Sequence, residues 1–77
     1  MTTWLVCTMD DGILSEHRTK RAAVDAVVRR EGWVQPRRLR AGEYEYTGPI
    51  VRGSVTSYYV MTEDGARRNG WERAISE

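Results

Sequence analysis

The sequence contains very little of what enzymes and metalloproteins use for chemistry. Its 77 residues include one cysteine, Cys7, and one histidine, His17. One cysteine excludes an internal disulfide, and it cannot form a structural zinc site with a single histidine. The glycines punctuate turns and do not form a phosphate-binding loop. We therefore expect no metal, no cofactor and no catalytic centre, and we interpret His17 as a surface or capping residue.

Long apolar runs are also missing. The longest is the strand-sized stretch from Trp4 to Cys7, far below the roughly 20 residues of a membrane span. The N-terminus lacks the basic start and apolar stretch of a signal peptide. Together with the scarcity of cysteine, this predicts a cytoplasmic protein with no membrane contact. Cys7 lies in an apolar strand pattern, so we expect a buried and inert thiol.

The length of the chain limits what it can do. We expect residues 1–77 to form one domain, and a chain this short buries only about 60–65% of the surface that its unfolded state exposes. A deep substrate cavity would remove most of such a core. The composition, 40% hydrophobic and 30% charged, is typical of a folded domain. These features favour a binding protein over an enzyme.

The clearest element in the sequence is a helix over residues 20–31. Thr19 is a suitable N-cap, and Gly32 can supply the left-handed residue that ends the helix. Basic residues fill the last turn, where the helix dipole favours cations. One face of the helix is apolar and comprises Ala23, Val24, Val27 and Val28.

The rest of the chain has the patterns of strands and turns. Residues 3–9 are apolar and β-branched, and Asp10-Asp11-Gly12 is a hairpin turn that leads into a short return strand over 13–15. Residues 43–47 alternate strictly, and 55–61 form the longest strand pattern, so we expect these two to pair as a hairpin. Between them, residues 48–53 are expected to form a glycine-bounded loop. Pro36 begins an extended segment that continues from Arg37 to Ala41.

These elements predict an α+β fold in which a small antiparallel sheet of about four strands carries the helix 20–31 on one face. The C-terminal part has two interpretations. Thr62-Glu63-Asp64 resembles the start of a short helix, and Trp71, Ala74 and Ile75 have helical spacing. Gly65 and Gly70 would each cost about 1 kcal/mol in a helix, and Glu63-Asp64-Gly65 also fits a hairpin turn. We favour the short helix.

Two groups of residues are candidates for binding. The first is rich in arginine: only Lys20 among the basic residues is a lysine, and the guanidinium group suits phosphate and carboxylate recognition. Its members are Arg37, Arg38, Arg40, Arg52, Arg67 and Arg68. With tryptophans nearby, such a group can bind nucleic acid. The alternative is a solvated arginine face, since the net charge is only +1.

The second group is the tyrosines of the expected hairpin. Tyr44 and Tyr46 share one face of their strand, and Tyr58 comes from the partner strand. If exposed, they would form an interface; if buried, they belong to the core. Glu43 and Glu45 lie on the opposite face of the strand, which we expect to be solvated.

Short length, absent catalytic and metal-binding residues, and polar-aromatic strands beside an arginine cluster characterise the whole chain. In this general build it resembles small inhibitors encoded by phages and mobile elements, including anti-CRISPR proteins. That resemblance implies a stoichiometric inhibitor that docks on a CRISPR surveillance complex and hinders its binding to target DNA.

We therefore predict a non-catalytic protein-binding inhibitor or adaptor. Its partner would be a host protein or a protein–nucleic-acid complex, and the chain itself would be a monomer or a weak homodimer. The alternative is a small nucleic-acid-binding protein that uses the same arginines.

Overall fold

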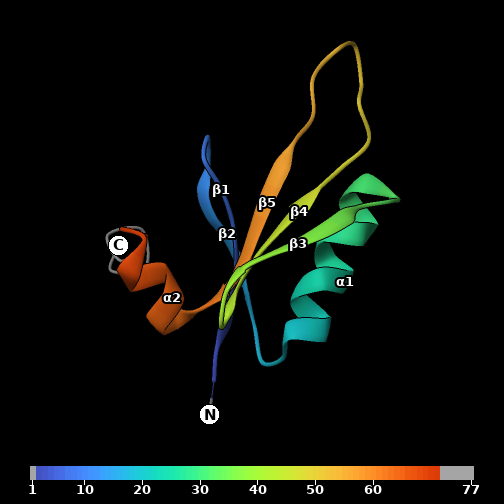
Figure 1. The fold of residues 1–77 in the computed structure, drawn as a ribbon. Helices are drawn as coiled ribbons and strands as arrows, with labels where there is room; N and C mark the ends of the chain where they lie inside the picture. Colours follow the sequence, from blue (N-terminus) through green and yellow to red (C-terminus); the bar gives the residue numbers. More distant parts are fainter. Residues whose placement is uncertain (1, 72–77) are drawn as a thin grey trace.

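The computed structural model describes residues 2–71 and shows a five-stranded antiparallel sheet with a helix on each face (Figure 1). The strand order is β2-β1-β5-β4-β3. The elements are β1 (Trp4–Thr8), β2 (Gly12–His17), α1 (Lys20–Glu31), β3 (Gln35–Arg40), β4 (Glu43–Thr47), β5 (Ser57–Thr62) and α2 (Glu63–Arg68). The predicted α+β class is confirmed. The additional strand is β3, where the sequence predicted only an extended segment.

The sheet places the first and last strands of the chain side by side, because β1 pairs with β2 on one side and with β5 on the other. β4 and β5 form the predicted hairpin, and β3 adds to the free side of β4. The two edges are therefore β2 and β3. Every residue of β3 is exposed, and it carries Pro36 and three arginines. Proline and charge at an edge oppose pairing with a further strand.

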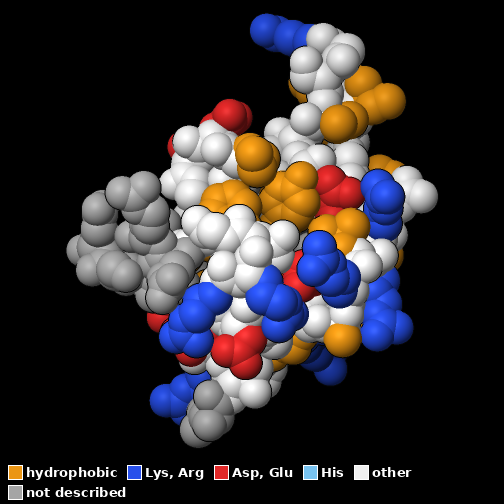
Figure 2. Space-filling view, turned by 60° about the vertical axis from the view of Figure 1, so that its left-hand side comes forward, with side chains coloured by type: hydrophobic (Ala, Val, Ile, Leu, Met, Phe, Trp, Pro, Cys, Tyr) orange, Lys and Arg blue, Asp and Glu red, His pale blue; other side chains and the backbone are white. Residues whose placement is uncertain are grey.

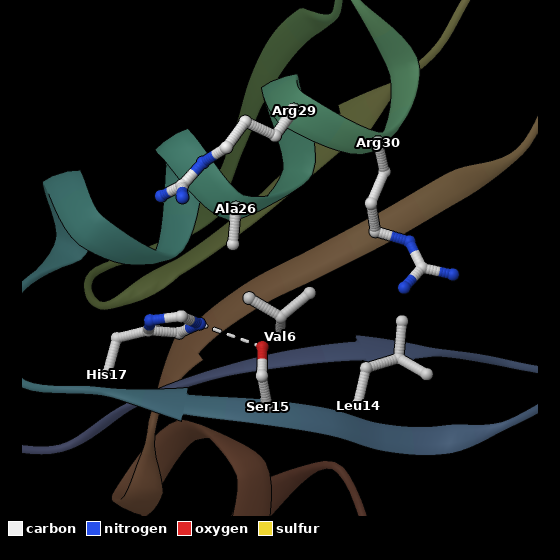
Figure 3. Close-up of a pocket in the computed structure, with 7 residues that line it drawn as sticks. All are labelled: Val6, Leu14, Ser15, His17, Ala26, Arg29 and Arg30. Carbon is white, nitrogen blue, oxygen red and sulfur yellow. Dashed lines mark hydrogen bonds between the residues drawn. The ribbon is translucent and has the colours of Figure 1, made fainter.

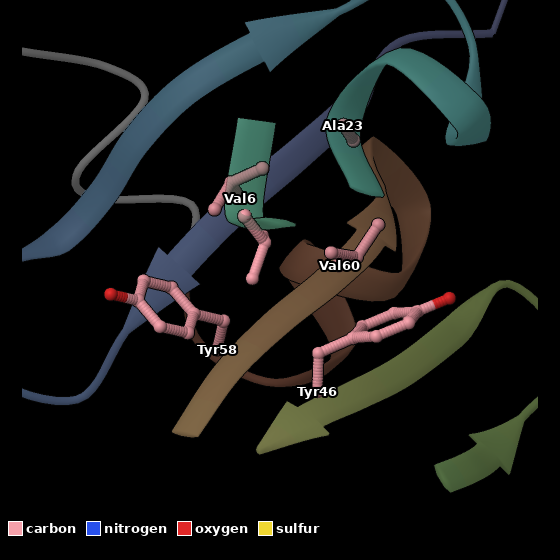
Figure 4. Packing of buried hydrophobic residues seen from close by; sticks show 6 residues of the cluster. Val6, Ala23, Tyr46, Tyr58 and Val60 are labelled. Carbon is pink, nitrogen blue, oxygen red and sulfur yellow. The ribbon is translucent and has the colours of Figure 1, made fainter. Parts of the chain in front are cut away.

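Helix α1 has the predicted bounds. The Thr19 side chain accepts a hydrogen bond from the Ala22 amide at 3.1 Å, and Gly32 has a φ of 80° at the C-terminal end. The helix covers one face of the sheet, where its apolar side packs on β1 and β5 (Figure 4). The buried residues of this layer are Val6, Ala23, Val27, Tyr46, Tyr58 and Val60.

Helix α2 covers the opposite face and confirms the helical interpretation of residues 63–68; residues 72–77 lie outside the described part of the chain. Ala66 of this helix packs in one buried cluster with Leu5, Cys7 and Met61 of the sheet. Cys7 is completely buried, and this burial raises the pKa of its thiol to about 12. The thiol therefore stays protonated at neutral pH, as expected for an inert cysteine. Within residues 2–71, no helix is long and apolar enough to cross a bilayer.

Gly65 lies inside α2, although the low helix propensity of glycine argues against a helix at this position. The Thr62 side chain caps the helix by accepting a hydrogen bond from the Gly65 amide at 3.1 Å. A Cβ atom on Gly65 would lie 2.9 Å from Cγ of Glu43, closer than carbon atoms normally approach. The glycine is therefore required for the close approach of α2 to β4, which outweighs its low helix propensity.

We expect Gly65→Ala to lower the free energy of unfolding by about 1 kcal/mol, because an overpacking cost of about 2 kcal/mol exceeds the roughly 1 kcal/mol gained in helix propensity. Urea denaturation measures the change. Arg21→Ala, at an exposed position of α1, is the control and should shift stability by less than about 0.5 kcal/mol. A Gly65→Ala variant more stable than the wild type would contradict this close packing.

Candidate protein-binding surface

The arginines of β3 face acidic residues on β4. Arg37 lies opposite Glu45 in the β3–β4 ladder, and Arg40 lies opposite Glu43. The Arg37 guanidinium is 3.7 Å from the Glu45 carboxylate. On the side of the sheet toward α2, basic and acidic side chains alternate over the surface (Figure 2). This arrangement neutralises much of the charge that the sequence suggested as a basic patch.

Glu43 is the centre of this charged cluster, and it is 1% exposed. Its carboxylate accepts hydrogen bonds from the Arg68 guanidinium at 2.9 and 3.2 Å and from the Asn69 side chain at 2.8 Å. The expectation that Glu43 is on a solvated face is therefore wrong. The reason is that α2, whose position the strand pattern does not reveal, covers this part of β4.

The environment of Glu43 has opposing effects on its pKa. Burial alone would raise the pKa of the carboxyl, because a charged group is poorly solvated there. The hydrogen bonds from Asn69 and Arg68 and the positive charges of Arg40 and Arg68 outweigh burial and lower the pKa below its ordinary 4.5. Glu43 is therefore a paired carboxylate in the folded protein at neutral pH.

The remaining predicted arginines lie in three different places. Arg38 is on the α1 side of β3, opposite Tyr44. Arg67 is on α2, 3.2 Å from the carboxylate of Asp64. Arg52 lies in the connection between β4 and β5. The structure therefore brings Arg37, Arg40 and Arg68 together beside Glu43 and Glu45, but it does not gather all six predicted arginines on one surface.

The tyrosines belong mainly to the core. Tyr46 is 6% exposed and Tyr58 is 4% exposed, so the core alternative holds for both. The Tyr58 hydroxyl donates a hydrogen bond to the Glu31 carboxylate at 2.7 Å, which ties β5 to the end of α1. Tyr44 is half-buried, and the Lys20 ammonium lies 3.5 Å from its ring centroid. None of these three side chains presents a free aromatic face to a partner.

The connection from β4 to β5 projects from the body as a hairpin-like arm over residues 48–56 (Figure 1). At its base the Gly48 amide donates to the Thr56 carbonyl at 3.0 Å. At its tip Val51 and Ser54 exchange two backbone hydrogen bonds, at 2.8 and 3.0 Å. The two residues between them, Arg52 and Gly53, have φ values of 54° and 78°. Positive φ at both central positions is the pattern of a type I′ hairpin turn, so the tip has a defined backbone.

The arm exposes three apolar side chains to solvent. Ile50 is 74% exposed, Val51 61% and Val55 48%. Figure 2 shows hydrophobic side chains along the arm, clear of the body, and a basic side chain at the tip. Arg52 is the single charged residue of the segment. The arm is therefore an apolar projection with one positive charge at its end.

Two further exposed hydrophobic residues lie at the same end of the sheet. Met9, which is 75% exposed, follows the last residue of β1, beside the start of β5. Trp33, which is 58% exposed, precedes β3, whose first residue pairs with the last residue of β4. Leu39 is exposed at the opposite end of the sheet. We call the end with the arm, Met9 and Trp33 the arm end.

The sequence interpretation treated residues 48–53 as a glycine-bounded loop and Val55 as part of a strand. A signal was nevertheless present: three β-branched apolar residues occur in a segment without the alternation that would bury them. Surface loops ordinarily carry polar and turn-forming residues. The sequence pattern does not reveal the arm, because Ile50 and Val51 lie between turn-forming glycines and Val55 fits the strand pattern that follows.

Comparison with protein-family models, curated proteins and solved structures found no match to this chain. Within residues 2–71, no three side chains of the metal-binding types gather into a group that could hold an ion.

The buried pairing of Glu43 predicts a specific loss of stability in acid. Because the pKa of Glu43 is lowered on folding, its contribution is complete above about pH 4.5 and is lost as the pH falls below that value. We expect Glu43→Gln to cost about 2 kcal/mol at neutral pH, and the difference from wild type to shrink as the pH falls below about 4.5.

Denaturant titrations across this pH range measure the difference. The matched control is Glu45→Gln on the same strand, where the ion pair is looser and the partner, Arg37, is exposed. Its effect should be smaller at every pH. A Glu43→Gln difference that stays constant or grows in acid would contradict the paired carboxylate.

Proposed function

We propose that this protein is a non-catalytic inhibitor or adaptor that inserts the arm, residues 48–56, into an apolar cleft of a host protein. The observation that carries the proposal is the exposure of Ile50, Val51 and Val55 on a projection with an ordered tip. Contiguous exposed apolar groups on a small protein mark interaction sites, because leaving them in water is unfavourable.

The shape and charge of the arm indicate what it would bind. A narrow projection fits a concave site, and its apolar flanks require an apolar lining. Burying a Val or Ile side chain completely contributes about 1.5–3 kcal/mol, so three such residues can anchor a complex. Arg52 at the tip, in a segment without acidic residues, requires a carboxylate at the far end of the cleft. The partner is therefore a protein with an apolar cleft that is acidic at its base.

The rest of the arm end provides additional contact surface. Trp33 and Met9 flank the base of the arm and are exposed. Tryptophan is enriched among the residues that dominate binding energy at interfaces. The resemblance to small phage-encoded inhibitors narrows the hypothesis to a multisubunit host target, such as a CRISPR surveillance complex, whose access to DNA the docked protein would obstruct.

The nucleic-acid alternative has less support. Three of its arginines, Arg37, Arg40 and Arg68, lie beside the carboxylates of Glu43 and Glu45. Carboxylates at these positions repel phosphates and occupy the guanidinium groups that would bind them. Arm insertion into a protein uses side chains that are free for contact.

We expect the double substitution Ile50→Ser and Val51→Ser to weaken partner binding by at least about tenfold, because two apolar anchors are lost. The partner is first retrieved from host lysate with tagged wild-type protein, identified by mass spectrometry and purified. Affinity is then measured by calorimetry, and amide hydrogen exchange maps the residues that the partner protects. The account requires protection of residues 48–56.

Leu39→Ser is the matched control, since it removes an exposed apolar side chain at the opposite end of the sheet. It should bind like wild type. If Leu39→Ser or the triple reversal Arg37→Glu, Arg38→Glu and Arg40→Glu abolishes binding while the arm variant retains it, the proposed surface is wrong. Light scattering of the free protein at high concentration detects the alternative in which the arm binds a second copy of the chain.

A further inference from the structure

A groove separate from the arm lies between the edge strand β2 and helix α1. It has a volume of about 330 Å³ and is open to solvent at the sheet edge. Its apolar part is formed by Val6 on the floor, Leu14 on β2 and Ala26 on α1 (Figure 3). The volume is at the lower limit of the roughly 300–1,000 Å³ typical of small-molecule sites.

Polar groups converge on the same groove from both walls. On β2 the Ser15 hydroxyl and the His17 ring form a hydrogen bond of 2.8 Å between Oγ and Nε2. From α1 the side chains of Arg29 and Arg30 extend over the groove, one toward His17 and the other toward Leu14 (Figure 3). None of the described residues that line the groove is acidic. An apolar floor beneath two guanidinium groups and two hydrogen-bonding side chains is a mixed lining suited to an amphiphilic anion.

The two arginines are not engaged in ion pairs with other described residues. Arg29 donates a long hydrogen bond, 3.4 Å, from Nε to the backbone carbonyl of Asp25. This bond does not use the two terminal nitrogens of the guanidinium, which can therefore bind a ligand. Arg30 is near the Tyr58 hydroxyl, whose own hydrogen bond goes to Glu31. In contrast to Arg37 and Arg68, neither Arg29 nor Arg30 faces a carboxylate across a salt bridge in residues 2–71.

We propose that this groove binds a small organic carboxylate, with its apolar part on Val6, Leu14 and Ala26 and its carboxylate between Arg29 and Arg30. A planar carboxylate matches the fork of a guanidinium group and forms charge-assisted hydrogen bonds with it. Because Ser15 and His17 are hydrogen-bonded to each other, this pair on β2 supplies one further donor, the His17 ring N–H or the Ser15 hydroxyl. Binding requires no bond to be made or broken.

The test is a titration of the ¹⁵N-labelled protein with phenylacetate, followed by NMR, and a parallel titration with the neutral amide phenylacetamide at matched ionic strength. We expect saturable shifts for phenylacetate centred on Val6, Leu14 and Ala26, and binding of phenylacetamide weaker by at least about tenfold. Equal binding of both compounds, shifts centred elsewhere, or no saturable binding would overturn the proposal.

Variants separate the role of the guanidinium groups from that of the fold. Arg29→Gln combined with Arg30→Gln should remove the preference for phenylacetate over phenylacetamide. Arg21→Gln, on the same helix but outside the groove, should keep it. The proposal would be contradicted if the amide NMR spectrum shows that the double variant is folded and the variant still prefers phenylacetate over phenylacetamide to the full extent. The arm variants leave this groove unchanged, so failure here and failure of arm-mediated binding are distinguishable.

Discussion

The pairing of β4 with β5 is the constraint on which the rest of the structure depends. At one end of this ladder Glu43 lies opposite Met61, beneath α2, and its carboxylate is held by Arg68 and Asn69. In the middle Tyr46 lies opposite Tyr58, and both are buried beneath α1. Residues of this ladder therefore contact both helices, one on each face of the sheet. At the other end the ladder continues into the arm, whose base is closed by the hydrogen bond between Gly48 and Thr56.

In this arrangement the charged residues of the surface stabilise the fold, whereas the exposed apolar residues are available for a partner. The arginines of β3 and α2 compensate carboxylates: Glu43 is buried, and a buried carboxylate without partners would be strongly destabilising. The apolar residues of the arm end contribute little to folding, because they remain exposed. Residues that stabilise the fold and residues available for a partner are thus largely separate, which permits a docking arm in a protein with a small core.

Local signals in the sequence were sufficient for much of the fold. Thr19 and Gly32 specify both ends of α1, and strict alternation over residues 43–47 specifies a strand with two different faces. Alternation does not specify which elements cover each face of the strand. For this reason the sequence predicts a solvated Glu43, whereas the structure buries it. Gly65 was interpreted by helix propensity, whereas its position is determined by contact with a residue more than twenty positions away in the sequence. The apolar residues of the arm were missed for the related reason that exposure depends on the whole fold.

The central claim is that the arm enters a partner protein, and the most direct measurement is site-specific photo-crosslinking in the host. A photoreactive amino acid replaces Val51 on the arm in one variant and Leu39 at the opposite end of the sheet in another. The account predicts a discrete covalent adduct with one protein from position 51 and none from position 39. An adduct from position 39, or none from position 51 in a folded variant that still acts in the host, would contradict it.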